Sequence, residues 1–254
     1  MGAGHGHALY VHEHSPVHRM APETKVLAVF LFVVAVAITP REALWAFGLY
    51  TLIELAVIRV ARIPGGFVLS RLASVIPFVI FALFLPFVGQ GKDEEFLGLA
   101  VSTAGVWAMW NVLAKALLGA TASIVLAATT ETPDILKGFS RLKVPGVITA
   151  IASFMIRYLE VIAGELDRMR TAMTARGYDP RWLWQSRPIA SSAGTLFIRS
   201  YERGERIYEA MLSRGYAGSM PRVSIETATA GQWIAAMTLP ALALIIAATA
   251  LVSG

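Results

Sequence analysis

Apolar residues in this chain are gathered into runs long enough to cross a bilayer. The runs cover residues 26–39, 43–60, 72–88, 96–130 and 231–252. A soluble domain carries about a quarter charged residues, whereas only 15% of this chain is charged and 56% is hydrophobic. Because about 20 apolar residues span a hydrocarbon core as a helix, the sequence predicts an all-α membrane protein with about five transmembrane helices.

Two of these runs are irregular. Pro77 lies inside the third run and predicts a kink there. The fourth run, residues 96–130, is far longer than a helix needs to cross the hydrocarbon core. We therefore expect it to tilt, to bend near Gly105 or Gly119, or to project beyond the bilayer. Its Lys115 is then expected near an interface or a protein contact.

Basic residues are concentrated before the last apolar run. Residues 131–230 hold 14 of the 22 Lys and Arg residues. Because Lys and Arg are retained on the cytoplasmic side, we expect a large cytoplasmic insert, a cytoplasmic N-terminus and a periplasmic C-terminus. In a membrane protein this charge needs no nucleic acid to explain it. The expected organisation is a His-rich polar tail (1–25), four transmembrane helices (26–130), the cytoplasmic helical region (131–230) and a last transmembrane helix (231–254).

The insert is predicted to be helical and amphipathic. A helix start is indicated at Thr132-Pro133-Asp134, where a capping residue is followed by Pro. Seven apolar residues then recur at spacings of three and four, as on one face of a helix: Ile151, Met155, Tyr158, Ile162, Leu166, Met169 and Met173. A second helix is expected over residues 191–214, with an apolar face formed by Phe197, Tyr201, Gly204, Tyr208 and Met211.

An internal repeat is the most informative feature of the insert. Residues 167–178 align with residues 205–216 at an offset of 38. Both copies read acidic, Arg, three residues, Ala-Met, one residue, a small residue, Arg-Gly-Tyr. Each copy is predicted to end a helix, because Gly after the helix accepts the left-handed conformation and Arg complements the negative end of the helix dipole.

Ordinary capping explains Arg-Gly in one copy, but it requires neither the preceding Ala-Met nor the following Tyr. Two helix ends that each present a planar guanidinium suit two matching acidic grooves on a dimeric partner. The candidate binding residues are Ala175, Arg176 and Gly177 in the first copy, and Ser213, Arg214 and Gly215 in the second.

These two motifs resemble the paired signatures of the transmembrane T component of energy-coupling factor transporters, in its cobalt-type branch. Residues 15–25 are similar to the family's N-terminal signature, although Met20-Ala21 stands where the family has Leu-Asp. Residues 129–136 and 142–145 are similar to its entry into the cytoplasmic helices. The resemblance covers nearly the whole chain.

The resemblance implies a non-catalytic coupling subunit in a bacterial inner membrane. Such a subunit joins two cytosolic ABC-type ATPases to a substrate-binding membrane subunit, and a further small membrane subunit is compatible with it. Arg176 and Arg214 would anchor the ATPases, and the stripe from Ile151 to Met173 would pack against the substrate-binding subunit or other helices of this chain. ATP and Mg²⁺ would lie on the partners, because residues 89–92 lack the spacing of a phosphate-binding loop. We expect no cofactor in this chain.

All five histidines fall in the first 18 residues: His5, His7, His12, His14 and His18. Imidazole suits cobalt, nickel or zinc, but a polar tail explains the first four equally well, and His18 is expected to be structural. Cobalt or nickel is the expected cargo, with a vitamin-type importer as the alternative.

Two other readings remain open. An intramembrane enzyme would need catalytic residues in its spans, where Glu54 stands alone. We expect Glu54 near the cytoplasmic end, with its carboxylate either extended toward the interface or paired with Arg59 or Arg62. A basic scaffold for anionic lipid would explain the charge but not the repeat.

Overall fold

The computed structural model describes residues 10–11, 13, 15–88, 93–96, 99–179, 187–218 and 228–253. The chain divides into two compact units. The first is a helical bundle formed by Gly6–Leu142 and Glu226–Gly254, and the second is a helix pair within Lys143–Ile225. Each unit is described separately below.

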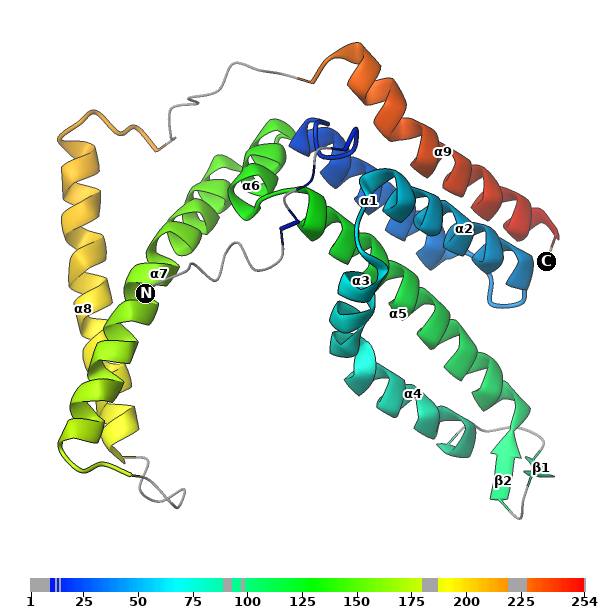
Figure 1. The fold of residues 1–254 in the computed structure, drawn as a ribbon, viewed down its shortest axis with the longest axis horizontal. Coiled ribbons are helices and arrows are strands. Elements are labelled where there is room, and N and C mark those ends of the chain that lie inside the picture. Colours follow the sequence, from blue (N-terminus) through cyan, green and yellow to red (C-terminus); the bar gives the residue numbers. More distant parts are fainter. Residues whose placement is uncertain are drawn as a thin grey trace. The chain divides into compact units, whose positions relative to one another are not determined.

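The bundle contains most of the apolar helices (Figure 1). Its elements are α1 (Pro22–Ile38), α2 (Leu44–Ala61), α3 (Gly65–Leu72), the 3₁₀ helix η2 (Ala73–Val75), α4 (Ile76–Val88), β1 (Asp93–Phe96), β2 (Leu99–Ser102), α5 (Thr103–Thr129), α6 (Thr132–Arg141) and α9 (Ala230–Ser253). The two strands form an antiparallel hairpin in which Asp93 is opposite Ser102. The hairpin corrects the prediction for the fourth apolar run, whose first residues extend as β2 before the helix begins.

Small residues let the helices of the bundle approach closely. Ala35 of α1, Ala46 of α2 and Ala243 of α9 have no exposed surface. Tyr50 of α2 lies among them, and its hydroxyl donates to the carbonyl of Ala243 at 3.2 Å and lies 2.9 Å from Thr39 Oγ1. Close backbone approach and satisfied polar groups are the ordinary basis of helix association within a membrane.

The irregular apolar runs have local explanations. The 3₁₀ turn η2 separates α3 from α4, and Pro77 is the second residue of α4. Gly105 lies against α4, because a Cβ on it would be 2.5 Å from the carbonyl oxygen of Leu85. The predicted protein contact of Lys115 is confirmed, since its Nζ donates to the carbonyl of Ala37 at 2.8 Å.

The helix pair consists of α7 (Gly146–Ala175) and α8 (Arg187–Leu212). The two helices run antiparallel, because Glu165 contacts Arg203 whereas Met173, further along α7, contacts Ser192, further back along α8. Figure 1 shows them side by side. Their lengths exceed the average helix, as expected of an amphipathic pair whose stability comes from packing.

Among the described residues, five helical segments are long and apolar enough to cross a membrane by length and composition: α2, Gly65–Phe87, α5, α7 and α9. The predicted class, an all-α membrane protein with about five such helices, is confirmed. The set of candidate membrane-spanning segments differs from the sequence prediction in two places. The first apolar run forms α1, which has only 17 residues, and α7 meets the length and composition although its sequence pattern is amphipathic.

Candidate functional site

The two copies of the repeat end their helices in the same way. After α7, the N–H of Gly177 donates to Thr174 O at 2.9 Å and the N–H of Tyr178 to Met173 O at 3.1 Å. After α8, Gly215 donates to Leu212 O at 2.9 Å and Tyr216 to Met211 O at 3.0 Å. This pair of bonds is the Schellman motif.

Both glycines lie in the left-handed region, with φ of +78° at Gly177 and +83° at Gly215. The predicted role of glycine at the two helix ends is therefore confirmed. The six candidate binding residues, Ala175 to Gly177 and Ser213 to Gly215, are all exposed. Within the described parts of the chain, neither Arg176 nor Arg214 forms an ion pair.

The two arginines lie at opposite ends of the helix pair. Arg176 follows the C-terminus of α7 and Arg214 follows that of α8, and the helices are antiparallel. The 26 residues of α8 measure about 39 Å at 1.5 Å per residue. The unit therefore presents two equivalent guanidinium groups, separated by roughly the length of a helix, rather than one joint site.

The predicted apolar stripe of α7 divides into two parts. Five of its residues are half-buried: Tyr158, Ile162, Leu166, Met169 and Met173. Met173 contacts Ser192 of α8, whose hydroxyl donates to its sulfur at 3.4 Å. Ile151 and Met155 are 55% and 68% exposed. The antiparallel register explains the division, because α8 ends at Leu212, so that Ile151 and Met155 lie beyond its end.

The predicted apolar face of the second helix lies on α8, and most of it is exposed. Phe197, Tyr201 and Tyr208 are 71%, 60% and 53% exposed, and Gly204 is exposed as well. The residues of α8 that turn toward α7 are half-buried and include polar ones: Ser192, Leu196, Ser200, Arg203, Ile207 and Met211. α8 therefore has two different faces, an exposed aromatic one and a narrower half-buried one that contains a charged residue.

One carboxylate holds the two helices together. Glu165 is 7% exposed. Its Oε1 accepts from Arg199 Nη1 at 3.1 Å and its Oε2 from Arg203 Nη2 at 3.3 Å. The apolar periodicity of the two helices did not indicate this pair. The signal that could have found the pair is its separation, since Glu165 and Arg203 are 38 residues apart, the offset of the repeat.

The stretches that carry the N-terminal and helix-entry signatures meet within the bundle. Glu23 is 4% exposed and both of its oxygens accept from Arg141 Nη1 at 3.0 Å. Its Oε1 also accepts from the N–H of Ala228 at 3.1 Å. A Cβ on Gly138 would lie 3.1 Å from the carbonyl carbon of Pro22. The start of α1 is thus fixed to α6 and to the segment that precedes α9.

His18 belongs to the same junction and has the structural role that was expected. Its Nε2 lies 3.0 Å from Val11 O, and since a carbonyl can only accept, this nitrogen carries the proton. Its Nδ1 then accepts from the hydroxyl of the fully buried Ser15 at 2.7 Å. Burial lowers the pKa of His18 below its ordinary value, and the charge of Lys25 acts in the same direction.

Metal binding by the tail is a prediction that falls mostly outside the described residues, since His5, His7, His12 and His14 are among those not described. Within the described ranges, no three His, Cys, Asp or Glu side chains lie together as a metal site would require. Residues 89–92 also lie outside these ranges.

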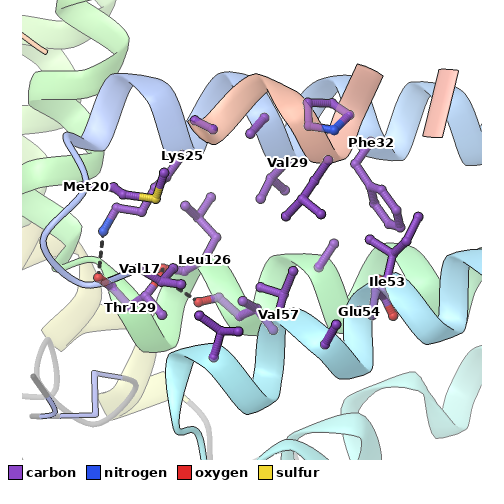
Figure 2. A pocket seen from close by; sticks show the side chains of 18 of the residues that line it. Val17, Met20, Lys25, Val29, Phe32, Ile53, Glu54, Val57, Leu126 and Thr129 are labelled. Carbon is purple, nitrogen blue, oxygen red and sulfur yellow. Dashed lines mark hydrogen bonds between the residues drawn. The ribbon is translucent and has the colours of Figure 1, made fainter. Parts of the chain in front are cut away.

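A cavity of about 340 Å³ lies between α1, α2, α5 and α9 (Figure 2). Its lining is apolar apart from Lys25, Glu54 and Thr129. Lys25 Nζ donates to Thr129 O at 2.8 Å. Glu54 is 8% exposed and its Oε1 has no partner among the described residues. The expected ion pair of Glu54 with Arg59 or Arg62 was therefore wrong, because the side chain turns into the bundle and away from the helix end.

Comparison with known proteins gives a consistent result. The CbiQ family, described as "Cobalt transport protein", matches residues 13–225. The energy-coupling factor transporter transmembrane protein EcfT of Staphylococcus aureus (strain 04-02981) is 26% identical over 235 residues, covering 85% of both chains. EcfT of Bacillus subtilis (strain 168) is 27% identical, covering 84% of this chain and 85% of its own. EcfT of Bacillus selenitireducens is 28% identical over 227 residues, covering 84% of both.

The match includes the junction around Glu23, both Arg-Gly-Tyr motifs and α1 to α8. It agrees with the resemblance seen in the sequence and confirms a transport component in place of an enzyme. The chain belongs to the CbiQ family, and so to the transmembrane T components of energy-coupling factor transporters.

Proposed function

We propose that this chain couples two cytosolic ABC-type ATPases to a substrate-binding membrane subunit in an importer for cobalt or nickel. The observation that carries the proposal is the pair of exposed arginines, Arg176 and Arg214, on two helix ends of the same backbone geometry. ATP-driven movement of the ATPases would move these ends, and α7 and α8 would carry the movement toward the substrate-binding subunit. The chain itself contributes no catalytic residue and no cofactor.

Each arginine is suited to an acidic groove. The guanidinium is planar, permanently charged and able to pair with a carboxylate through two parallel hydrogen bonds. Small neighbours, Ala175 and Gly177 or Ser213 and Gly215, allow a partner's backbone to approach closely. The two arginines lie at opposite ends of an antiparallel pair, and this separation favours two ATPase subunits over one.

The exposed apolar surface of the helix pair supports the proposed contact with the substrate-binding subunit. Ile151, Met155 and Leu159 of α7 are 55%, 68% and 60% exposed, and they share one face of the helix at spacings of four. Phe197 and Tyr201 add aromatic surface on α8. Contiguous apolar surface of this kind marks a protein or membrane contact, and we assign it to the substrate-binding subunit within the lipid bilayer.

Reversal of both charges tests the ATPase contact. Arg176→Glu together with Arg214→Glu should abolish co-purification with the ATPases while membrane insertion is retained. Arg157→Glu with Arg170→Glu is the matched control, since both side chains are exposed on α7 and the change in net charge is the same. If Arg176→Glu with Arg214→Glu still co-purified with the ATPases at the wild-type yield, the proposed role of these two arginines would be refuted.

The cargo and the orientation need separate tests. Uptake of radioactive cobalt by cells that express the complete transporter should exceed uptake of a vitamin, and the reverse result would favour the vitamin-type alternative. We also propose an inner-membrane location with a cytoplasmic N-terminus and a periplasmic C-terminus, because residues 131–230 carry most of the basic charge. A topology reporter fused within residues 131–230 that reports the periplasm would overturn this orientation.

A further inference from the structure

The internal repeat is present in the packing of the helix pair as well as in its sequence. Six half-buried residues of α8 turn toward α7: Ser192, Leu196, Ser200, Arg203, Ile207 and Met211. The residues 38 positions earlier are Phe154, Tyr158, Ile162, Glu165, Met169 and Met173, and each of these is half-buried or buried in α7. Each helix therefore turns the equivalent face toward the other.

The contacts between these faces join equivalent positions. Glu165 pairs with Arg203, and the two are separated by the repeat offset of 38. Two antiparallel helices that meet at equivalent positions are related by a local two-fold axis between those positions. The contact of Met173 with Ser192 keeps the same register to within one helical turn. The axis therefore passes beside the Glu165–Arg203 ion pair.

A two-fold axis imposes a condition on any residue beside it. A charged residue repeated without change would face its own copy, and like charges brought together are destabilising. The residues at these two equivalent positions, which precede the copies of the repeat by two residues, are Glu165 in α7 and Arg203 in α8. By contrast, the exposed Arg-Gly-Tyr ends are the same in both copies, since they lie far from the axis and do not meet.

The distances along the helices are matched as well. Arg176 follows Glu165 by 11 positions, and Arg214 follows Arg203 by the same number. At 1.5 Å per residue, each guanidinium-bearing end lies about 16 Å along its helix from the ion pair. The ion pair is thus at the centre of the unit, and both ends depend on the angle at which the helices cross there.

We propose that Glu165 is a positioning residue that sets this crossing, so that the two arginine ends are presented with two-fold symmetry to a partner made of two equivalent subunits. The proposal rests on the proposed function, in which the partner is the ATPase pair. Glu165 touches neither end itself. It acts through Arg203, on the axis, and through Arg199, one helical turn earlier in α8, so that its carboxylate holds α8 at two points.

A distance measurement tests the geometry without any partner. The chain contains no Cys, so a Thr171→Cys and Glu209→Cys pair can carry two spin labels at exposed, equivalent positions, one near each end. In the full-length protein in lipid nanodiscs we expect one narrow distance distribution. Glu165→Gln should broaden and shift it. Asp167→Asn is the matched control, because Asp167 is exposed and its ion pair among the described residues is with Arg170 of the same helix, at 3.9 Å. It should leave the distribution unchanged.

Transport by the assembled complex tests the positioning role. With Arg176 and Arg214 intact, Glu165→Gln should keep the ATPases bound but lose most ATP-driven uptake. Exchange of the charges, Glu165→Arg with Arg199→Glu and Arg203→Glu, should restore both the narrow distribution and uptake. This variant keeps the test decisive if Glu165→Gln alone inserts poorly.

Three results would overturn the proposal: Glu165→Gln behaving as Asp167→Asn in both measurements, a broadened distribution with unchanged uptake, or an exchanged pair that does not recover. Failure of the proposed function would give a different result. In that case Arg176→Glu with Arg214→Glu still binds the ATPases, whereas Glu165→Gln still broadens the spin-label distance distribution of the isolated chain.

Discussion

At the scale of single residues, Glu23 is the group whose removal should cost most in the bundle. Its carboxylate is 4% exposed and receives three hydrogen bonds, two from Arg141 and one from the N–H of Ala228. Glu23→Gln removes the buried carboxylate charge that accepts from Arg141 and from the N–H of Ala228, at a cost of about 2 kcal/mol in the free energy of unfolding. We expect a lower melting temperature in detergent, by about 5 °C.

Glu42→Gln provides the control for this change. Glu42 pairs with Arg41 at 2.8 Å, but its side chain is 61% exposed, and exposed pairs contribute about 0–1 kcal/mol. Its melting temperature should stay close to that of the wild type. Equal melting temperatures for Glu23→Gln and Glu42→Gln would contradict the central role of Glu23.

His18 gives the junction a defined pH dependence. Its neutral form is held by Val11 O and the Ser15 hydroxyl, and burial lowers its pKa in the folded chain. Between that lowered pKa and the ordinary value of about 6.5, the unfolded chain binds more protons, so stability falls as the pH falls. Lys25 adds to the lowering, and Glu13 and the backbone carbonyls of Val11 and Ala128 oppose it.

The check is a comparison of melting temperatures at about pH 7.5 and about pH 5.5, on either side of the ordinary histidine pKa. The wild type should lose more stability on acidification than His18→Gln, which lacks the titrating group. An equal loss in both proteins would assign the acid sensitivity to other groups.

Residue-level prediction succeeded where the backbone alone decides the outcome. Gly177 and Gly215 adopt positive φ because the residue that closes a helix in this way is left-handed, and glycine adopts that conformation without steric cost. It failed for the partner of Glu54 and did not identify the half-buried stripe of α8, since both depend on which neighbour the side chain meets. The pairing of Glu165 with Arg203 lies between these cases. The two residues are separated by the repeat offset of 38, but their contact also requires that the two helices pack antiparallel.

At the scale of elements, α4 and α5 depend on glycine at one point of contact. A Cβ on Gly105 would lie 2.5 Å from Leu85 O and 2.7 Å from Pro86 Cα, and backbone atoms cannot move aside as a flexible side chain can. Gly105→Ala should therefore destabilise the packing of α4 on α5 by about 1–3 kcal/mol, as overpacking does. Gly119→Ala in the same helix has nothing within 4 Å of its new Cβ and should be neutral or stabilising by up to about 1 kcal/mol.

Limited proteolysis near the β1–β2 hairpin checks this prediction, since loosened packing of α4 on α5 should expose the connection between them. Gly105→Ala should be cut faster than the wild type and Gly119→Ala at the wild-type rate. Similar cleavage rates for the two alanine variants would show that the packing of α4 on α5 does not depend on the close contact at Gly105.

Element positions followed the apolar periodicity, which is why the helices of the bundle lie close to the predicted runs. The start of α5 did not, because residues before Thr103 pair as a strand hairpin and strand pairing is a contact with another segment. For the same reason the sequence indicated η2 only through Pro77, and it predicted α7 as an amphipathic helix without identifying the helix that packs against it. What the sequence predicts well are the properties of one segment; what it misses are properties of pairs.

At the scale of the whole molecule, the equivalence of the two helix ends predicts how single variants behave. If each end occupies one subunit of a paired ATPase, the second contact forms at the high effective concentration set by the first, and losing it weakens binding by about 10²-fold or more. Arg176→Glu and Arg214→Glu should therefore weaken ATPase association strongly, and by similar amounts, because both ends have the same exposed motif and Schellman geometry.

Titration of the purified chain with the ATPases measures this effect, with Arg170→Glu as a single-charge control on an exposed side chain. The two single variants should also match in the amount of ATPase bound per chain at saturation, since each retains one intact end. If one variant abolishes binding and the other is silent, the ends do not act as equivalent contacts. The local two-fold symmetry of the helix pair would then have no counterpart in the partner, because a symmetric partner cannot distinguish its two halves.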